Sequence, residues 1–263
     1  MSAPTDKSVE LLLDTNLFVS QVVQAGFASF VSVVASVDSS QNVLLATPAE
    51  QLRHEQYLVV EHQTGGRGRL DRSWQTQPGQ AVMMSFVWDS EQLAFAAELV
   101  PIAVGVAVAR ALKPVVDSVG LKWPNDVMAD ELKLGGIIAS HHADNPRFIV
   151  CGVGLNHSLP LERPVHNAGS ISECATDIPS REHVLRDVIR NLHLVTLCKS
   201  AEVVATYRDL STTIGQQVRC EKVSGEVLEG FAVDIDGSGQ LLIEVDGHVQ
   251  SHATGDVFHL RSL

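Results

Sequence analysis

The stretch best suited to bind an anion is GRGR at residues 66–69, where glycine and arginine alternate. It separates an apolar run that ends at Val60 from a second one that starts at Ala81, so it is predicted to be a loop between two strands. Glycine lets backbone N–H groups come close to a ligand, and guanidinium groups supply paired donors for carboxylate or phosphate. The pattern therefore favours an anion-binding loop. A flexible, solvated hairpin is the alternative.

A lysine in an apolar setting is the second candidate. Lys122 lies in the run LKWPNDV at residues 121–127, between leucine and tryptophan, and Pro124 should end the strand. An ammonium group that is buried needs an anionic partner or loses its proton. Either a bound anion meets Lys122, or its stem lies along an edge strand and its head reaches water.

Glycines in a strand provide a place for a flat ligand. Gly152 and Gly154 alternate within the apolar run at residues 148–155, so both lie on one face and leave a groove. A second lysine, Lys133, and Gly136 begin the preceding strand, which returns after a hairpin turn at residues 130–131.

Small polar side chains follow the first predicted strand. Ser39, Ser40 and Gln41 come directly before a helical pattern, which is where N-caps belong. Capping is the simplest role, although a hydroxyl at the end of a strand can also face a ligand.

The periodicity predicts strands and helices in alternation, followed by a small all-β tail. A capping-box pattern from Thr47 to Glu50 predicts a short helix ending near His54. Turn signals beyond Ile214 separate five short strands, typical of a small barrel, and place a domain boundary between residues 1–211 and 212–263. The other predicted helices span 8–26, 93–112 and 180–210. The other predicted strands span 30–37, 57–61, 81–88 and 148–155, and a further strand around Lys122 should end at Pro124.

Composition excludes several classes of protein. The chain has 263 residues and a net charge of −12, which argues against binding along nucleic-acid phosphates. Its four cysteines form no C-x-x-C pair and its histidines show no metal-ligand spacing, so no fixed protein metal site, zinc site or disulfide framework is expected. No signal-peptide pattern opens the chain, and residues 93–112 carry Glu98, Pro101 and Arg110, unlike a membrane span. We expect a cytoplasmic protein that does not contact membranes.

Taken together, the motifs EHQTGGRGR, LKWPNDV, KLGGII and GVGLN resemble those of the biotin protein ligases. The resemblance covers about residues 30 to 160, and the β-rich tail extends it to the C-terminus. It implies an α+β fold, in which a mixed sheet flanked by helices, related to class II aminoacyl-tRNA synthetases, precedes a C-terminal SH3-like barrel.

The same resemblance implies a biotin–[biotin carboxyl-carrier protein] ligase. Such an enzyme activates biotin with ATP and Mg²⁺ as biotinyl-5'-AMP and transfers it to a lysine of the carrier domain of a carboxylase. A monomer or weak homodimer that binds no DNA is expected, because about 28 residues before the first strand cannot hold a winged helix-turn-helix domain, which disfavours a biotin-sensing repressor. A lipoate or octanoate ligase or transferase and a non-catalytic biotin-binding module are the alternatives.

Matching the motifs residue by residue implies a set of roles. Lys122 and Arg69 are the expected catalytic cations, since attack of a carboxylate on the α-phosphate needs fixed positive charge and no covalent nucleophile. Trp74 is expected to stack on adenine, unless it is part of the core. The sequence departs from the family pattern at Ser40, at Gln41 and at Leu70-Asp71, where an acid precedes Arg72. The expected biotin-binding residues are Ser39, Ser40, Gln41, Gln63, Gly66, Arg67, Gly68, Arg69, Lys122, Gly136, Gly152 and Gly154. The expected ATP-binding residues are Arg69, Arg72, Trp74, Asn125, Lys133 and Asn156.

Overall fold

A seven-stranded mixed sheet forms the larger part of the computed structural model, which describes residues 12–28, 30–69, 72–160, 165, 167–221, 225–253 and 255–260. Its strand order is β1-β2-β3-β7-β6-β5-β4. Only β1 and β2 are paired in parallel, and every other neighbouring pair is antiparallel. The strands are β1 (Phe30–Val37), β2 (Gln56–Gln63), β3 (Ala81–Asp89), β4 (Val119–Lys122), β5 (Asp126–Ala129), β6 (Leu132–His141) and β7 (Phe148–Asn156).

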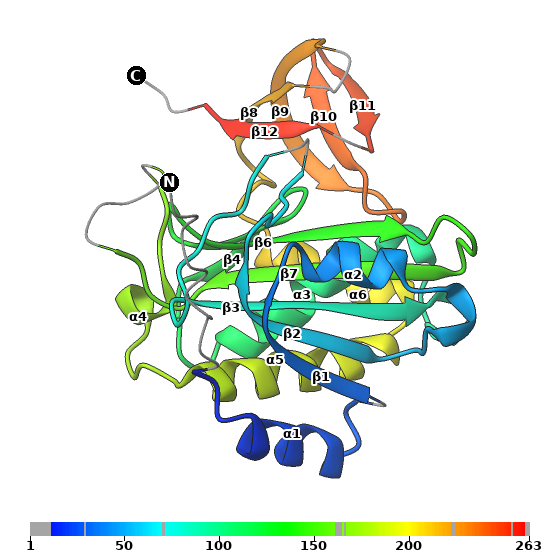
Figure 1. Cartoon of the computed structure of the whole chain (residues 1–263). Helices are drawn as coiled ribbons and strands as arrows, with labels where there is room; N and C mark the ends of the chain where they lie inside the picture. Colours follow the sequence, from blue (N-terminus) through cyan, green and yellow to red (C-terminus); the bar gives the residue numbers. More distant parts are fainter. Residues whose placement is uncertain are drawn as a thin grey trace, which may run out of the picture.

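Helices cover the two faces of this sheet unequally (Figure 1). On one face, α3 (Val100–Leu112) packs against α5 (Arg181–Thr196) and α6 (Ser200–Leu210). The short α2 (Ser40–Ala46) lies on the opposite face, against β3, β7 and β2. Because α2 covers only part of that face, the rest of it can receive a ligand. The remaining helices are α1 (Thr15–Gln24), which packs against α5, α4 (Ile171–Cys174), and the 3-10 turns Ala49–Gln51, Ser90–Gln92 and Ala97–Leu99.

The most apolar helix is a core element. Eleven of the 13 residues of α3 are buried, and the helix is apolar all round because sheet and helices surround it. None of the helices in the described part of the chain is long and apolar enough to cross a membrane.

A second sheet follows α6 and is entirely antiparallel, in the order β11-β10-β9-β8-β12. The five short strands predicted from the turn signals are confirmed. A backbone bridge from Ser211 to Leu121 and a hydrogen bond from Trp123 N to Thr213 Oγ1 (3.0 Å) attach this sheet to β4. The predicted domain boundary at residues 211/212 lies in the connecting segment and remains a prediction. The strands are β8 (Gln217–Glu221), β9 (Val227–Ile235), β10 (Leu241–Val245), β11 (His248–His252) and β12 (Asp256–His259).

Several local predictions were wrong. Thr47 does not cap a new helix: it ends α2, its hydroxyl donates to Val43 O (2.8 Å), and only the 3-10 turn Ala49–Gln51 follows. The helix predicted from residue 93 begins at Val100, after the 3-10 turn Ala97–Leu99. The pattern at 180–210 forms two helices because the chain turns between Leu197 and Lys199. Of the helix predicted at 8–26, the described part forms α1, and residues 1–11 lie outside the described residues.

Candidate active site

A row of directly paired residues crosses the face of the sheet that carries α2. Met83 pairs with Gly154, Gly154 with Gly136, Gly136 with Asp126, and Asp126 with Lys122. Directly opposite residues in neighbouring strands project from the same face. The two glycines therefore form a floor without side chains, and charged residues lie at one end of it.

Neutral polar groups lie at the other end of this glycine floor. Gln63 Oε1 accepts hydrogen bonds from the backbone N–H (2.7 Å) and the hydroxyl (3.1 Å) of Ser40. The Ser40 hydroxyl also lies 2.7 Å from Ser85 Oγ, and Ser85 pairs with Gly152. Such a buried network of uncharged donors and acceptors suits a neutral polar ring.

The two other residues of the serine-rich segment play structural roles. Ser39 Oγ accepts from Asn42 N (3.4 Å), so the predicted N-cap of α2 is confirmed. Gln41 is buried, and its amide donates to Val150 O (3.2 Å), which ties α2 to the centre of the sheet. These contacts fix the position of Ser40.

The GRGR loop is a short β-type hairpin, which we call the arginine hairpin (residues 66–69 and 72–74). Trp74 N donates to Gly66 O (2.8 Å), Gly68 N donates to Arg72 O (2.7 Å), and a bridge joins Arg67 to Ser73. A Cβ atom at position 66 would lie 2.3 Å from Trp74 O, so only glycine allows this close approach. The departure at Leu70-Asp71 lies outside the described residues.

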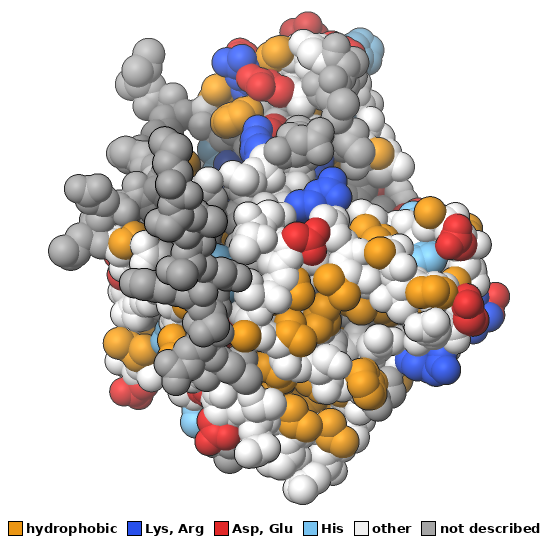
Figure 2. Space-filling view, viewed as in Figure 1, with side chains coloured by type: hydrophobic (Ala, Val, Ile, Leu, Met, Phe, Trp, Pro, Cys, Tyr) orange, Lys and Arg blue, Asp and Glu red, His pale blue; other side chains and the backbone are white. Residues whose placement is uncertain are grey.

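The three arginines of the hairpin reach three different elements. Arg67 Nη1 donates to Asn42 Oδ1 of α2 (3.1 Å). Arg69 Nη1 donates to Asn125 Oδ1 (3.2 Å) and to the carbonyl oxygen of Gly255 in the second sheet (3.4 Å). Arg72 forms an ion pair with Asp256. In Figure 2, Lys and Arg side chains are visible where the two sheets meet.

Trp74 lies on the glycine floor. A Cβ atom at Gly154 would lie 2.9 Å from the indole Cε2 and Nε1 atoms, and one at Gly136 would lie 3.8 Å from Cζ3. The indole Nε1–H is buried and has no hydrogen-bond partner among the residues that the structure describes. Trp74 is half-buried, and its indole rests directly on Gly154 and Gly136, so it covers the glycine floor rather than packing into the hydrophobic core. Stacking on adenine remains a prediction.

Two lysines flank one carboxylate at the charged end. Lys133 Nζ lies 2.5 Å from Asp126 Oδ1, and the same ammonium would be 3.9 Å from a Cβ atom at Gly136. Lys122 is the last residue of β4, and its Nζ lies 6.0 Å from the centre of the Phe258 ring in β12. Lys133 thus approaches the glycine floor directly, whereas Lys122 lies farther along the row, toward the second sheet.

Partial burial lowers the pKa values of two cations in the site. Partial burial lowers the pKa of Lys122, an effect that the Asp126 carboxylate opposes. Partial burial also lowers the pKa of Arg69, and Asp256 and Asp126 oppose it. These groups lose hydration before any ligand arrives, so an anion that reaches them interacts strongly.

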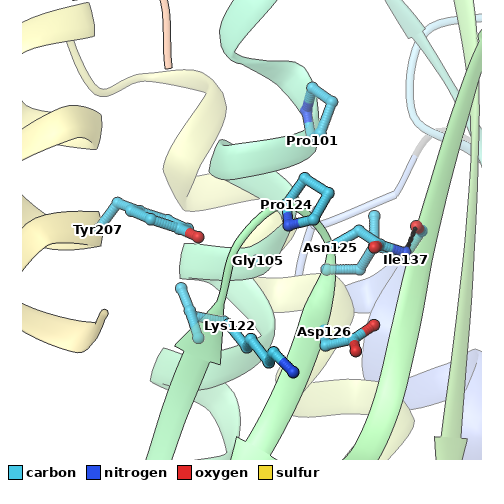
Figure 3. Close-up of a pocket in the computed structure, with 9 residues that line it drawn as sticks. Pro101, Gly105, Lys122, Pro124, Asn125, Asp126, Ile137 and Tyr207 are labelled. Atoms are coloured by element: carbon cyan, nitrogen blue, oxygen red, sulfur yellow. Dashed lines mark hydrogen bonds between the residues drawn. The ribbon is translucent and has the colours of Figure 1, made fainter. Parts of the chain in front are cut away.

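Residues of α3 and α6 lie beside the segment that carries Lys122, Asn125 and Asp126 (Figure 3). Asn125 Nδ2 donates to Ile137 O (2.8 Å), the hydrogen bond drawn in the close-up. Tyr207 of α6 is buried and points toward the same turn. Helices from distant parts of the chain therefore hold this turn in place.

A cavity of about 560 Å³ opens beside Lys122. It lies between the β5–β6 hairpin and β12, and Asp130, Glu131 and Phe258 are among its lining residues. The side chain of Asn156 donates to Gly169 O (2.9 Å) and holds the loop that follows, and its role in ATP binding remains a prediction. Among the described residues, no cluster of three or more His, Cys, Asp or Glu side chains could hold a metal ion.

Sequence reasoning missed three polar residues of the site. Asp126 was visible within the LKWPNDV motif, and its pairing with Lys122 and Gly136 identifies its position. Ser85 lies in an otherwise apolar strand, a signal that could have been read. Asp256 gave no local signal because only the arrangement of the two sheets brings it to Arg72.

The chain is similar to known proteins in both sequence and fold. Residues 33–156 match the model of the biotin/lipoate A/B protein ligase family, and residues 213–260 match that of the biotin protein ligase C-terminal domain. The biotin–[acetyl-CoA-carboxylase] ligase of Mycobacterium tuberculosis is 34% identical, over 95% of this chain and 96% of the relative. The bifunctional ligase/repressor BirA of Escherichia coli is 29% identical, over 86% of this chain and 73% of that protein. A biotin protein ligase from Aquifex aeolicus, solved in complex with biotin and ATP, has the same fold: the TM-score is 0.75 at 24% identity, with 89% of this chain and 100% of that one covered.

Proposed function

The chain belongs to the biotin protein ligase family, and we propose that the glycine floor beneath the arginine hairpin is where it activates biotin. The protein is an ATP-dependent biotin protein ligase. In the first step a biotin carboxylate oxygen attacks the α-phosphorus of ATP, and pyrophosphate leaves. In the second step a lysine amine attacks the acyl carbon of biotinyl-5'-AMP, and AMP leaves.

One observation supports this position for the substrate. The floor formed by Gly136 and Gly154 connects a neutral polar network to a cationic cluster. A molecule with an uncharged polar ring, an apolar chain and a terminal carboxylate matches this order of groups. The biotin ring then lies beside Ser40 and Gln63, and its chain lies over the glycines once the Trp74 indole has moved off them. Its carboxylate points toward Lys133 and Arg69.

The cations supply the catalysis. Negative charge grows on the phosphoryl oxygens as the carboxylate attacks, and fixed cations in a partly desolvated site stabilise that charge. Arg69, held by Asn125, and Lys133, held by Asp126, are already oriented. Lys122 adds positive charge from farther along the row. We assign the nucleotide to the side of the groove that Trp74 and Arg72 cover.

No covalent enzyme intermediate is needed. Burial raises the pKa of the Cys151 thiol, which lies in the core, so this cysteine is not a thiolate nucleophile. Mg²⁺ would enter with the ATP phosphates and neutralise part of their charge. The described residues fit that role better than a fixed protein site, because Asp126 and Asp256 are each paired with a cation.

We further propose that the acceptor is the biotin carboxyl carrier domain of a carboxylase, in the cytoplasm, and that the enzyme acts as a monomer or weak homodimer. The similarity to the M. tuberculosis ligase over nearly the whole of both chains supports this acceptor class.

The test compares three acids under identical conditions. The purified protein, ATP and Mg²⁺ should release pyrophosphate with biotin, whereas lipoate and octanoate should give only background release. Addition of a purified carrier domain should then yield biotinylated carrier. Faster pyrophosphate release with lipoate or octanoate would support the alternative activity, and binding of biotin without any release would support a non-catalytic module.

A further inference from the structure

The second sheet contributes two groups to the arginine hairpin, the carbonyl oxygen of Gly255 and the carboxylate of Asp256. We propose that Asp256 is a positioning residue that latches the hairpin over the groove through Arg72, so that the adenylate is retained until the acceptor lysine arrives. This inference rests on the proposed function and assigns the C-terminal domain a part in it.

Asp256 is held rigidly within its own sheet. It begins β12 and pairs with Glu221 of β8. At the preceding Gly255, a Cβ atom would lie 2.7 Å from Cys220 Sγ, so the backbone passes against the interior of the second sheet. The Asp256 side chain is only 16% exposed. Its carboxylate therefore has little freedom to move away from the hairpin.

Arg72 is equally tied to the groups that cover the groove. Its carbonyl oxygen accepts the hydrogen bond from Gly68 N, and the neighbouring Ser73 bridges to Arg67. Residue 74, whose indole covers the glycine floor, follows at once. Because the hairpin is one hydrogen-bonded unit, an anchor on Arg72 also restrains Arg69 and Trp74.

Asp256 could act on the nearby cations in two ways, as a latch for the hairpin or as a counter-ion. Its carboxylate lies close enough to Arg69 and Lys122 to raise the pKa of each. As a latch, its pair with Arg72 holds the hairpin over the adenylate once that intermediate has formed, and the same pair slows amide exchange in the ligand-free hairpin. As a mere counter-ion, it would be displaced by ATP phosphates, and its removal would strengthen ATP binding. The rigid pairing of Asp256 and the extra contact from Gly255 to Arg69 favour the latch.

The solvent exposure of the Arg72–Asp256 ion pair determines how much its loss should speed adenylate release. The Arg72 side chain is 66% exposed, and exposed ion pairs are weak and are screened by salt. Neutralising Asp256 should therefore speed adenylate release about 2- to 5-fold rather than abolish activity.

The experiment uses the full chain with Asp256→Asn, and with Asp246→Asn as the matched control. Asp246 is an exposed carboxylate in the β10–β11 turn with φ 50°, a conformation that asparagine also tolerates. Release of labelled biotinyl-5'-AMP and amide exchange of residues 66–69 and 72–74 are measured. Asp256→Asn should speed both, and Asp246→Asn should behave like the wild type. The Kd for biotin alone should not change.

Salt and a conservative variant separate the latch from a general structural effect. About 0.5 M NaCl should speed adenylate release from the wild type and leave Asp256→Asn nearly unaffected, because no ion pair remains to be screened. Asp256→Glu should restore part of the retention.

Two results would overturn the proposal: wild-type retention and exchange in Asp256→Asn, or a lower KM for ATP with slower release. Absence of pyrophosphate release from the wild type would instead count against the proposed function. Exchange in the ligand-free hairpin tests the latch contact independently of that function.

Discussion

Arg181 at the start of α5 forms a buried ion pair with Glu61 near the end of β2, with 2.6 Å between Nη1 and Oε1. The same carboxylate oxygen accepts the backbone N–H of Gly79 (2.7 Å), and Oε2 accepts that of Leu12 (3.2 Å). Glu61 thus joins both ends of the segment that carries the arginine hairpin. The base of the hairpin is therefore held by buried contacts.

Removal of one partner of this pair should cost stability. Arg181→Met leaves the Glu61 carboxylate buried without its cation, so we expect a loss of about 3 kcal/mol or more in the free energy of unfolding. Urea denaturation gives the value. Arg186→Met, which removes a half-exposed ion pair from the same helix, is the control and should cost less than about 1 kcal/mol. Equal losses in the two variants would contradict this view of Glu61.

Arg69→Ala should release the reactive intermediate without unfolding the protein. The guanidinium donates to Asn125 Oδ1 and to Gly255 O from a surface hairpin, so its loss should weaken adenylate binding more than stability. Diffuse biotinylation of a bystander protein is the readout, with exposed Arg190→Ala as the control. Strict carrier specificity in Arg69→Ala would count against this role.

The segment from residue 65 to 78 should respond to substrate. Its described part, residues 65–69 and 72–78, is tied at its base by Glu61 and includes the exposed Arg72–Asp256 pair, and we expect it to lie at the low end of local stability. Its amide hydrogens should exchange quickly without ligand and more slowly with biotin and ATP. Equal protection in the two states would show that no closure accompanies binding.

The two lysines of the site can be ranked. Lys122→Met should raise the KM for biotin and lower kcat together, while the fold survives. Because Lys133 is the ammonium closest to the glycine floor, Lys133→Met should lose more, about 100-fold or more in kcat/KM. Exposed Lys199→Met is the control. Near-normal pyrophosphate release in both site variants would refute the assignment of the reaction to this end of the groove.

Acid should lower the free energy of unfolding because the Asp89 carboxylate becomes protonated. Hydrogen bonds from Arg147 lower the pKa of this carboxyl from 3.8 to about 2. A depressed carboxyl pKa stabilises the folded state above the unfolded value, and the contribution is lost as pH falls from about 4 to 2. After allowance for solvent around the half-exposed guanidinium, we expect about 1 to 2 kcal/mol at neutral pH.

Unfolding at pH 7 and pH 3 measures this contribution. Asp89→Asn should be less stable than the wild type at pH 7, and the difference should shrink at pH 3. Glu91→Gln removes the more exposed partner of the same arginine and should change little. A difference between wild type and Asp89→Asn that does not depend on pH would contradict the proposed coupling.

The local features of this protein could be predicted from its sequence. Continuous apolar runs located the strands that flank the arginine hairpin, and turn residues located the five strands of the second sheet. A cap was predicted within the segment that holds Ser39 and Ser40, and Ser39 is the residue that caps α2. The glycines at 152 and 154 were predicted to share a face because side chains alternate along any strand. Each of these features depends on residues within a few positions of one another.

Contacts between distant segments were decided by the tertiary structure. The order β7-β6-β5-β4 determines that Lys133, rather than Lys122, approaches the glycine floor. Asp256 meets Arg72 across 184 positions. The physical reason is that backbone preferences specify elements, whereas strand register and the packing of whole sheets determine which side chains become neighbours.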